Sequence, residues 1–294
     1  MQSLFQALLD ELRGQFEPQH DKPDETPESV LRALWFHAAG TPMSIRRING
    51  SPLPPIGERS VELLRTLVER KREGVPLAHL TGRQDFMGLE LLAGPAALIP
   101  RRETEILGIA ALGHLRRATD ESLLATDVCT GSGNLALALA HHEPRATVYA
   151  ADLSSEAVAL AQRNAAFTGL AGRVEFRAGD LFAPLEGIGL EGRCHLVTCN
   201  PPYVPSGKVP RMAREISAYE PPLAFDGGAL GLAIVWRLLA EAPRFLKSGG
   251  ALCFELGLGQ GALESRVRRA PWVERVETHR DATGEIRALT AIRR

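Results

Sequence analysis

The amino-acid sequence predicts an α/β fold with a mostly parallel sheet, an antiparallel hairpin at its C-terminal end and a small helical domain at its N-terminus. Short apolar segments alternate with helical ones from residue 122 onward, which is typical of a parallel sheet with helices on both faces. The last two apolar segments follow each other with only a turn between them. Before residue 76, apolar residues instead recur at helical spacing.

Composition excludes several classes of protein. The chain has 294 residues, 45% of them hydrophobic, and a net charge of −1. No overall positive field therefore favours binding to nucleic acid or to an anionic membrane. Four cysteines without a Cys-x-x-Cys pair argue against a disulfide framework and a structural metal ion. Because no signal peptide and no stretch of 18 apolar residues is present, we expect a cytoplasmic protein without a membrane partner.

The N-terminal residues 1–75 are expected to form the helical domain. Helical spacing covers residues 3–14, and a second helix should begin after Thr26 with Pro27 in its first turn. A third helix is predicted over 58–73, after a loop at 41–57 that is rich in proline and glycine. The first 30 residues hold seven acidic and two basic residues, a net charge of −5.

A linker over residues 76–105 is expected to join this domain to a larger one at 106–294. Residues 89–92 and 96–99 are apolar and flank Gly94 and Pro95, which predicts a short hairpin turning at these two residues. In the larger domain we expect strands at 123–128, 147–151, 173–177, 194–199 and 250–255, helices at 133–142, 154–167, 229–246 and 258–269, and a terminal hairpin of 272–279 with 285–292.

A glycine-containing loop follows the first of these strands and opens a helix. Its residues are Cys129, Thr130, Gly131, Ser132 and Gly133. Glycines allow a ligand to approach the backbone closely, and a helix N-terminus offers free N–H groups. Asp152 ends the second strand, where a carboxylate can accept both hydroxyls of a ribose. These features predict a nucleoside cofactor, and the spacing from Gly131 to Ala136 keeps NAD as an alternative.

A second constellation, Asn200-Pro201-Pro202-Tyr203, comes directly after the strand at 194–199. Two consecutive prolines cannot continue a central strand, so they predict a rigid turn at the carboxyl edge of the sheet, where such folds bind ligands. Asn200 brings an amide oxygen, and the prolines bring carbonyls that no local N–H satisfies. Tyr203 adds a flat face. Together they form an acceptor-rich clamp for a planar NH₂ group.

Such a clamp suits methyl transfer to an amide or an aromatic amine. Two acceptors that hold both N–H bonds localise the nitrogen lone pair, and positioning with electrostatic stabilisation supplies the rate without a metal ion. A dehydrogenase reaction, by contrast, requires no function of this turn. An adenine-N6 nucleic-acid methyltransferase would use the same clamp, but the acidic N-terminus counts against binding to phosphates. A non-catalytic protein that kept the fold is a further alternative.

Seven motifs occur in order along the chain: PLAHLTG (76–82), LIPRRETE (98–105), DVCTGSG (127–133), AADLS (150–154), NPPYVP (200–205), EPPLAFDGG (220–228) and FLKSGG (245–250). The set resembles the protein N5-glutamine methyltransferases, most closely the branch that modifies peptide-chain release factors. The resemblance covers residues 60–294 and implies a Rossmann-like S-adenosylmethionine-dependent methyltransferase fold. It also implies methyl transfer to the glutamine of a Gly-Gly-Gln loop, with S-adenosylhomocysteine as the product.

The resemblance also implies roles for individual residues. Asn200, Pro201 and Tyr203 would be catalytic, and with Pro202 they would hold the glutamine. The helical domain would help to grip the protein substrate, and no direct nucleic-acid binding is expected. The residues implied for the cofactor are Arg101, Glu103, Cys129, Thr130, Gly131, Ser132, Gly133, Asp152, Asp180, Leu181 and Asn200.

Cys129 departs from the family pattern, because it stands where the first glycine of the loop usually lies. A cysteine here is similar to the sister branch that acts on a ribosomal protein, which keeps that glutamine, another protein or a small-molecule amide as alternative substrates. Because cysteine has a Cβ atom, we expect an ordinary negative φ at Cys129.

Overall fold

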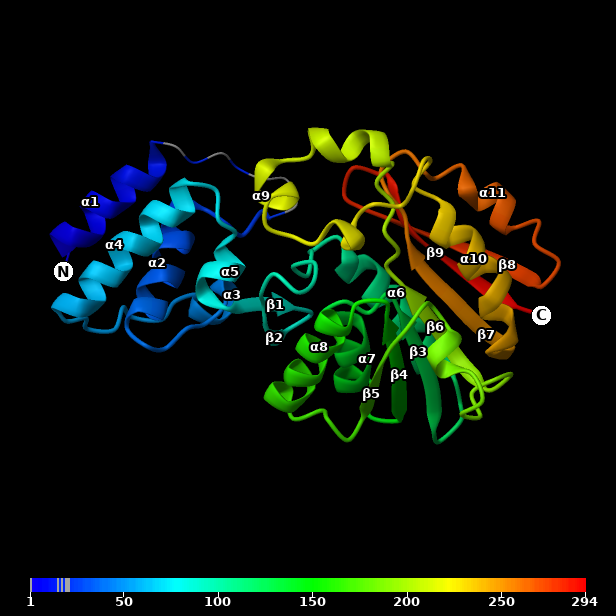
Figure 1. The fold of residues 1–294 in the computed structure, drawn as a ribbon. Coiled ribbons are helices and arrows are strands. Elements are labelled where there is room, and N and C mark those ends of the chain that lie inside the picture. The colour runs from blue at the N-terminus through cyan, green and yellow to red at the C-terminus, as the bar shows by residue number, and fades with distance from the viewer. Residues whose placement is uncertain (1, 15, 17, 19–21) are drawn as a thin grey trace.

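A computed structural model describes residues 2–14, 16, 18 and 22–294, and places a helical part before an α/β part (Figure 1). Glu17 and Asp21, which contribute to the acidic N-terminus, lie outside the described residues. The helical part contains α1 (Gln2–Arg13), α2 (Pro27–Ala38), α3 (Ile45–Ile48), α4 (Glu58–Arg72) and α5 (Leu77–Thr81). The predicted helices are confirmed, whereas α3 lies inside the segment predicted as a loop.

Local chemistry explains where α2 begins. Thr26 caps the helix, and its hydroxyl accepts a hydrogen bond from the Ser29 amide at 3.1 Å. Pro27 takes the first helical position, where its missing N–H has no cost. The helix buries Trp35 completely, and the indole N–H donates to the Pro54 carbonyl at 2.8 Å. The apolar cluster of this part extends to Leu77 and Leu80 of α5.

The hairpin of the linker lies earlier in the chain than predicted. It pairs β1 (Arg83–Phe86) with β2 (Leu89–Leu92), so the predicted pairing of 89–92 with 96–99 around Gly94-Pro95 is wrong. The turn consists of Met87 and Gly88, with φ of 50° and 81°. Positive φ at both positions matches the twist of a two-residue hairpin. The segment that follows β2 forms no strand and passes Pro95, which has no N–H for a ladder.

Seven strands form the central sheet in the order β5-β4-β3-β6-β7-β9-β8. Strand β9 is antiparallel to both of its neighbours, and the pairs among β3 to β7 are parallel. The predicted strands are therefore confirmed, with a β7 that begins earlier than expected. Their bounds are β3 (Leu123–Val128), β4 (Ala146–Asp152), β5 (Val174–Ala178), β6 (Cys194–Cys199), β7 (Leu246–Glu255), β8 (Val273–Arg280) and β9 (Ile286–Arg293).

The helices of the α/β part are α6 (Thr104–Arg117), α7 (Asn134–His142), α8 (Ser155–Thr168), α9 (Arg214–Ser217), α10 (Ala233–Glu241) and α11 (Leu263–Val267). Short 3₁₀ turns cover Ala183–Leu185, Ser206–Arg211, Pro222–Ala224 and Ala242–Arg244. Two predicted helices are shorter than expected. The one predicted over 229–246 begins after Gly231, whose φ is 69°, and gives way to a 3₁₀ turn at Pro243. The one predicted over 258–269 begins only after the glycines up to Gly261.

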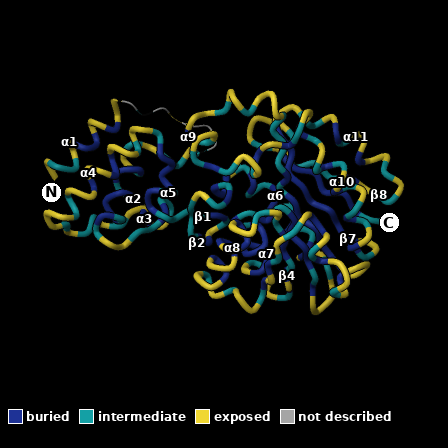
Figure 2. The backbone as a smooth tube through the Cα atoms, viewed as in Figure 1, coloured by how far each residue is buried: buried dark blue, intermediate teal, exposed yellow. Residues whose placement is uncertain are grey.

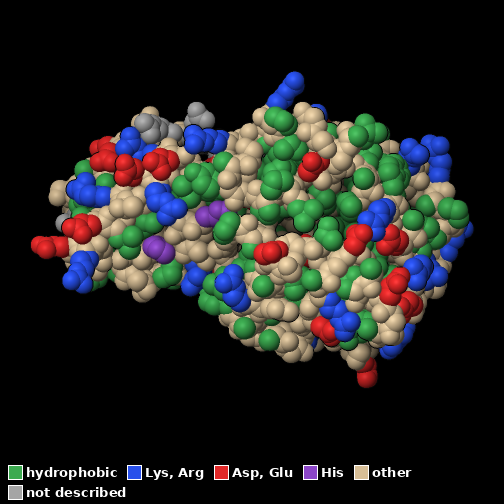
Figure 3. Space-filling view, in the orientation of Figure 1, with side chains coloured by type: hydrophobic (Ala, Val, Ile, Leu, Met, Phe, Trp, Pro, Cys, Tyr) green, Lys and Arg blue, Asp and Glu red, His purple; other side chains and the backbone are tan. Residues whose placement is uncertain are grey.

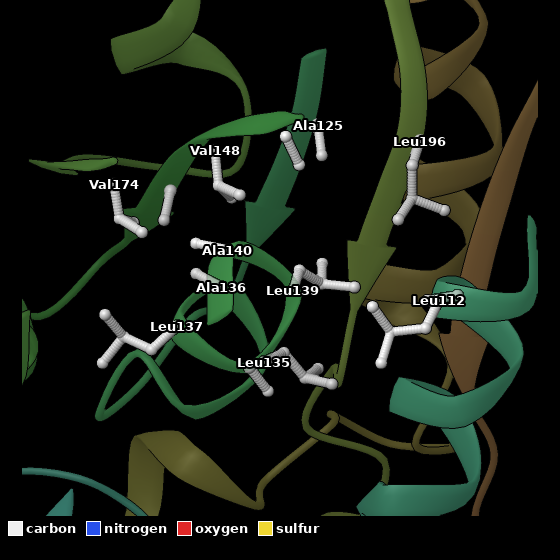
Figure 4. Packing of buried hydrophobic residues seen from close by; sticks show 14 of the residues in the cluster. Leu112, Ala125, Leu135, Ala136, Leu137, Leu139, Ala140, Val148, Val174 and Leu196 are labelled. Carbon is white, nitrogen blue, oxygen red and sulfur yellow. The ribbon is translucent and has the colours of Figure 1, made fainter. Parts of the chain in front are cut away.

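The sheet is buried between two helical layers (Figure 2). Helices α6, α7 and α8 pack on one face, and α10 and α11 join the apolar cluster on the other. Figure 4 shows Ala136, Leu139 and Ala140 of α7 facing the strands, next to Val148 and Leu196. Small residues on α7 let this helix approach the sheet closely. In the described ranges, no helix is long and apolar enough to cross a membrane.

The strand order reverses at β3, which lies between β4 and β6. At such a switch point the loops that leave neighbouring strands diverge and open a crevice at the carboxyl ends. The loop after β3 holds Cys129 to Gly133, and the turn after β6 holds Asn200 to Tyr203. The topology therefore brings the two predicted constellations to the same edge of the sheet.

Candidate active site

A cavity opens at this edge, with a volume of about 1030 Å³ including solvent at its mouth. Small-molecule sites are typically of roughly 300–1,000 Å³. Hydrophobic side chains surround a hollow on the α/β part in the face seen in Figure 3. Among the residues predicted for the site, those that line this cavity are Arg101, Cys129, Thr130, Gly131, Ser132, Asp152, Asp180, Leu181, Asn200 and Pro202.

The loop after β3 is shaped by alternating left-handed residues. Cys129, Gly131 and Gly133 have φ of 58°, 55° and 80°. The prediction of an ordinary φ at Cys129 is therefore wrong. A non-glycine residue in this region costs roughly 1–2 kcal/mol and persists only when the surroundings enforce it. Here two hydrogen bonds fix the neighbouring Thr130. Its amide donates to the Ala151 carbonyl at 3.0 Å, and its hydroxyl donates to Asp127 Oδ2 at 2.6 Å.

Gly133 serves the packing of the loop and does not line the cavity. It caps α7, and a Cβ atom at this position would lie 2.9 Å from Phe176 Cζ and 3.1 Å from Ala161 Cβ. Contacts under 3.0 Å require something to move. Gly133 thus lets the start of α7 lie directly against β5 and α8.

Asp152 presents its carboxylate from the end of β4. Its Oδ2 accepts from the Gly131 amide at 2.8 Å, and Oδ1 accepts from the Ser154 amide at 2.9 Å. Burial raises the pKa of this carboxyl, and the amide hydrogen bonds lower it in part. A carboxylate has about four lone-pair positions, so each oxygen keeps an acceptor position for a hydroxyl group in the cavity.

Asp127 supports the loop after β3 through its buried carboxylate. The sequence did not predict it as a site residue. It is fully buried, and Thr130 and Thr198 donate to its two oxygens at 2.6 and 2.7 Å. Burial raises its pKa to about 6, and the Asp152 charge acts in the same direction. Because Thr198 belongs to β6, Asp127 links the loop after β3 to the strand that carries the second constellation.

The turn after β6 is held by side chains. Asn200 Nδ2 donates to Thr104 Oγ1 at 3.1 Å, and the Tyr203 hydroxyl donates to Glu255 Oε1 at 3.1 Å. Gln260 Nε2 donates to the Tyr203 carbonyl at 3.3 Å. Within the described part of the chain, no N–H donates to the carbonyls of Pro201 or Pro202. The Pro202 oxygen faces Gly227, where a Cβ atom would lie 2.4 Å away.

A smaller cavity adjoins the first on the other side of Asn200. Pro201, Tyr203 and Glu103 line this second cavity and not the first, together with apolar side chains such as Met212 and Phe225. Asn200 lines both cavities. The two ligand-sized spaces therefore meet at the one side chain that offers an amide oxygen between them.

Glu103 was predicted to lie near the cofactor, and the structure places it in the wall of the second cavity. Its carboxylate pairs with Arg287 of β9 at 2.5 Å. Arg101 does line the first cavity and pairs with the buried Glu220. Glu220 also accepts from the Ile99 amide at 2.9 Å, so it ties the segment before α6 to the segment after the turn. The sequence analysis included Glu220 in the motif EPPLAFDGG (220–228), but it predicted no role for this residue.

Comparisons with known proteins identify the family of this chain. Residues 110–219 match the methyltransferase small domain family. A release factor glutamine methyltransferase of Moorella thermoacetica is 42% identical over 228 residues, which cover 77% of this chain and 78% of the relative. Another, of Deinococcus radiodurans, is 38% identical over 269 residues, 91% of this chain and 92% of the relative.

The chain belongs to the release factor glutamine methyltransferase family. The predicted resemblance is therefore confirmed, and the dehydrogenase alternative is set aside. The catalytic domain of hMettl16, solved with a MAT2A 3′UTR hairpin, has a TM-score of 0.53 at 15% identity, over 70% of this chain and 76% of that one. The N-terminal domain of human METTL16 has a TM-score of 0.52 at 17% identity, over 75% and 81%. At these identities the likeness confirms the methyltransferase fold alone.

Proposed function

We propose that this methyltransferase transfers a methyl group from S-adenosylmethionine to the side-chain amide nitrogen of a glutamine in a peptide-chain release factor. The observation that carries the proposal is the position of Asn200, which lines both cavities at once. A cofactor in the first cavity and a glutamine side chain in the second would meet at this residue. The names of the curated relatives support a release factor as the substrate. The Gly-Gly-Gln loop, which the family resemblance implies, is the segment that we propose is modified.

The residues of the first cavity fit an adenosine cofactor. Asp152 keeps an acceptor position on each oxygen for the ribose hydroxyls, and the backbone of the loop from Cys129 to Gly133 curves around the space for the methionine part. Leu181 and Ile234 offer apolar walls for a base, and Asp180 stands at the rim, where it pairs with Arg237 at 3.0 Å. The cofactor supplies an electrophilic sulfonium methyl group when it is bound.

The turn after β6 would prepare the acceptor nitrogen. An amide nitrogen is a poor nucleophile because its lone pair is delocalised over the carbonyl. The Asn200 Oδ1 atom and the Pro201 carbonyl would accept its two N–H bonds, and Tyr203 would pack against the side chain. These acceptors interact more strongly as positive charge develops on the nitrogen, so they stabilise the transition state more than the ground state.

The helical part would contribute to recognition of the protein substrate. We assign this role to residues 1–75, with 76–105 as the linker and 106–294 as the catalytic domain. Acidic and basic side chains both lie over the N-terminal helices in the face shown in Figure 3, whereas hydrophobic ones surround the hollow of the α/β part. Such a surface favours a protein partner over nucleic acid. A cytoplasmic location follows from a translation factor as substrate.

Incubation with S-adenosylmethionine and the host release factors tests the proposal, with the methyl group mapped by peptide mass spectrometry. We expect one methyl group on the glutamine of the Gly-Gly-Gln loop. Asn200→Ala should greatly slow its transfer, and Gln162→Ala, which changes an exposed amide side chain on α8, should leave it intact. Cofactor binding without transfer to release factors would redirect the search to a ribosomal protein, a small-molecule amide or an adenine.

A further inference from the structure

A buried carboxyl group lies beneath the turn after β6. Glu255 ends β7, and only 2% of its surface is exposed. Its Oε1 atom accepts the Tyr203 hydroxyl, whereas Oε2 is buried with no hydrogen bond of ordinary geometry in the part of the chain that the structure describes. Buried polar atoms are nearly always paired, so an unmatched carboxyl oxygen beside an active site requires an explanation.

Thr104 connects this carboxyl to Asn200. It is the first residue of α6 and is 1% exposed. Its Oγ1 atom accepts from Asn200 Nδ2, and its hydroxyl lies close enough to Glu255 to lower the pKa of that carboxyl. A hydroxyl has a single proton to donate. Because the oxygen accepts from Asn200, the proton is available to the Glu255 side.

We propose that Glu255 is a positioning residue for methyl transfer, which acts on Asn200 through Thr104 and on Tyr203 directly. Two hydrogen bonds have a fixed direction: Asn200 donates to Thr104, and Tyr203 donates to Glu255. The Thr104 hydroxyl stabilises the charged form of the Glu255 carboxyl, which places this carboxylate next to both donors. This direction keeps the Asn200 NH₂ group on Thr104 and leaves its Oδ1 atom as the acceptor between the two cavities. The proposal rests on the function proposed above for Asn200.

The charge of Glu255 sets the direction of these hydrogen bonds. Burial raises its pKa to about 7, against the opposing effects of Thr104, Arg287 and Tyr203, while the neighbouring Glu103 raises it further. The carboxyl is thus ionised above this pH. Once protonated, it becomes a donor itself, and its best acceptors are the Thr104 and Tyr203 oxygens. The Thr104 hydroxyl proton then turns toward Asn200, and the amide no longer has a fixed orientation.

Substitutions at Thr104 test this role against a purely structural one. Thr104→Val keeps the shape and removes the hydroxyl, so kcat should fall roughly 10- to 100-fold, as expected for a displaced reactive group. The cofactor Kd, measured by calorimetry, should stay close to the wild-type value. Thr104→Ser should restore kcat. Thr126→Val is the matched control, because Thr126 is also buried and its hydroxyl has no hydrogen-bond partner among the described residues.

Glu255→Gln provides a second test that does not depend on Thr104→Val folding. For the wild-type enzyme, kcat should rise with pH to a plateau, with the midpoint of the rise near pH 7. The variant should lose this dependence and reach a lower plateau. Equal kcat in Thr104→Val and Thr126→Val, or an unchanged pH profile in Glu255→Gln, would overturn the proposal. A wild-type enzyme that transfers no methyl group to any glutamine would instead contradict the proposed function.

Discussion

The two loops that form the site are built in different ways. The loop after β3 is shaped by its backbone: it has left-handed residues at 129, 131 and 133. The amides of Thr130, Gly131 and Gly133 donate to the Ala151 carbonyl, the Asp152 carboxylate and the Thr130 carbonyl. The turn after β6 contains no left-handed residue, and it depends on hydrogen bonds from Asn200 and Tyr203 to Thr104 and Glu255. One site thus joins a backbone cradle to a side-chain clamp.

The difference predicts how each loop responds to substitution. A change in the backbone cradle alters the conformation that the chain can adopt, so it should affect folding and cofactor affinity together. A change in the clamp removes one polar atom and leaves the backbone in place. Its effect should therefore fall on kcat, with little loss of stability.

The largest expected effect is on the clamp. Asn200→Ala removes the acceptor between the cavities, and loss of one such group typically lowers kcat by about 10²- to 10³-fold. Stability and cofactor affinity should change far less, because the proline-rich backbone remains. Single-turnover kinetics with thermal unfolding in parallel measures both. A loss of stability as large as that of the cradle variants would remove the distinction between the two loops.

The next effect is on the stability of the cradle. Gly133→Ala combines a left-handed alanine with a Cβ atom 2.9 Å from Phe176 Cζ, and together strain and overpacking cost roughly 2–5 kcal/mol. Gly169→Ala is the matched control, since Gly169 has φ of 74° and nothing within 4 Å. It should cost only about 1 kcal/mol, the strain alone. Chemical denaturation gives both free energies, and equal losses would show that packing at Gly133 is unimportant.

A smaller effect is expected on cofactor affinity. Asp152→Asn replaces one acceptor oxygen by an NH₂ group, which would face the amide of Gly131 or Ser154. Charged hydrogen bonds contribute about 1.5–3 kcal/mol, so the Kd for S-adenosylmethionine should rise roughly 10- to 100-fold. Calorimetry measures this change, and Asp10→Asn on the exposed face of α1 serves as the control. An unchanged Kd would show that Asp152 does not hold the ribose.

The smallest effect concerns pH and stability. The pKa of Asp127 is raised to about 6 by burial, above the ordinary value of 3.8. The folded protein therefore binds this proton more tightly than the unfolded chain, and the free energy of unfolding decreases as the pH rises from about 4 to about 6. Asp127→Asn should remove roughly 1–2 kcal/mol of this dependence. Denaturation curves at pH 5 and pH 7 measure this dependence for the wild type and for Asp127→Asn. An equal change in the free energy of unfolding in the two proteins would contradict the role of Asp127.

Much of this architecture could be predicted from the sequence because the signals are local. The strands β3 and β6 are bounded as predicted, since apolar runs end at a glycine loop and at consecutive prolines. The start of α2 followed from Thr26 and Pro27. Asp152 and Asn200 were found because each directly follows a strand, where the topology of the fold places ligands.

The remaining features depend on contacts between distant residues. The hairpin at Met87-Gly88 lacks the Asn-Gly or Asp-Gly pair that usually marks a two-residue turn. The φ of Cys129 is imposed by Thr130 and Asp127 and has no signature of its own. Glu255 ends an apolar strand, and only the fold brings it to Thr104 and Tyr203. Such groups give no periodic pattern, because their partners come from other elements.

Two ion pairs of one buried carboxylate constrain how this enzyme can be altered through evolution. Glu215 lies in α9, downstream of the clamp, and its buried carboxylate pairs with Lys22 at 2.6 Å and Lys71 at 3.4 Å, both from the helical part. Breaking a buried pair from one side costs roughly 3–5 kcal/mol. The helical part therefore cannot be exchanged between proteins as a free module. A chimera that gains a new recognition domain by recombination has to bring cations matching Lys22 and Lys71, or replace Glu215 in the same event.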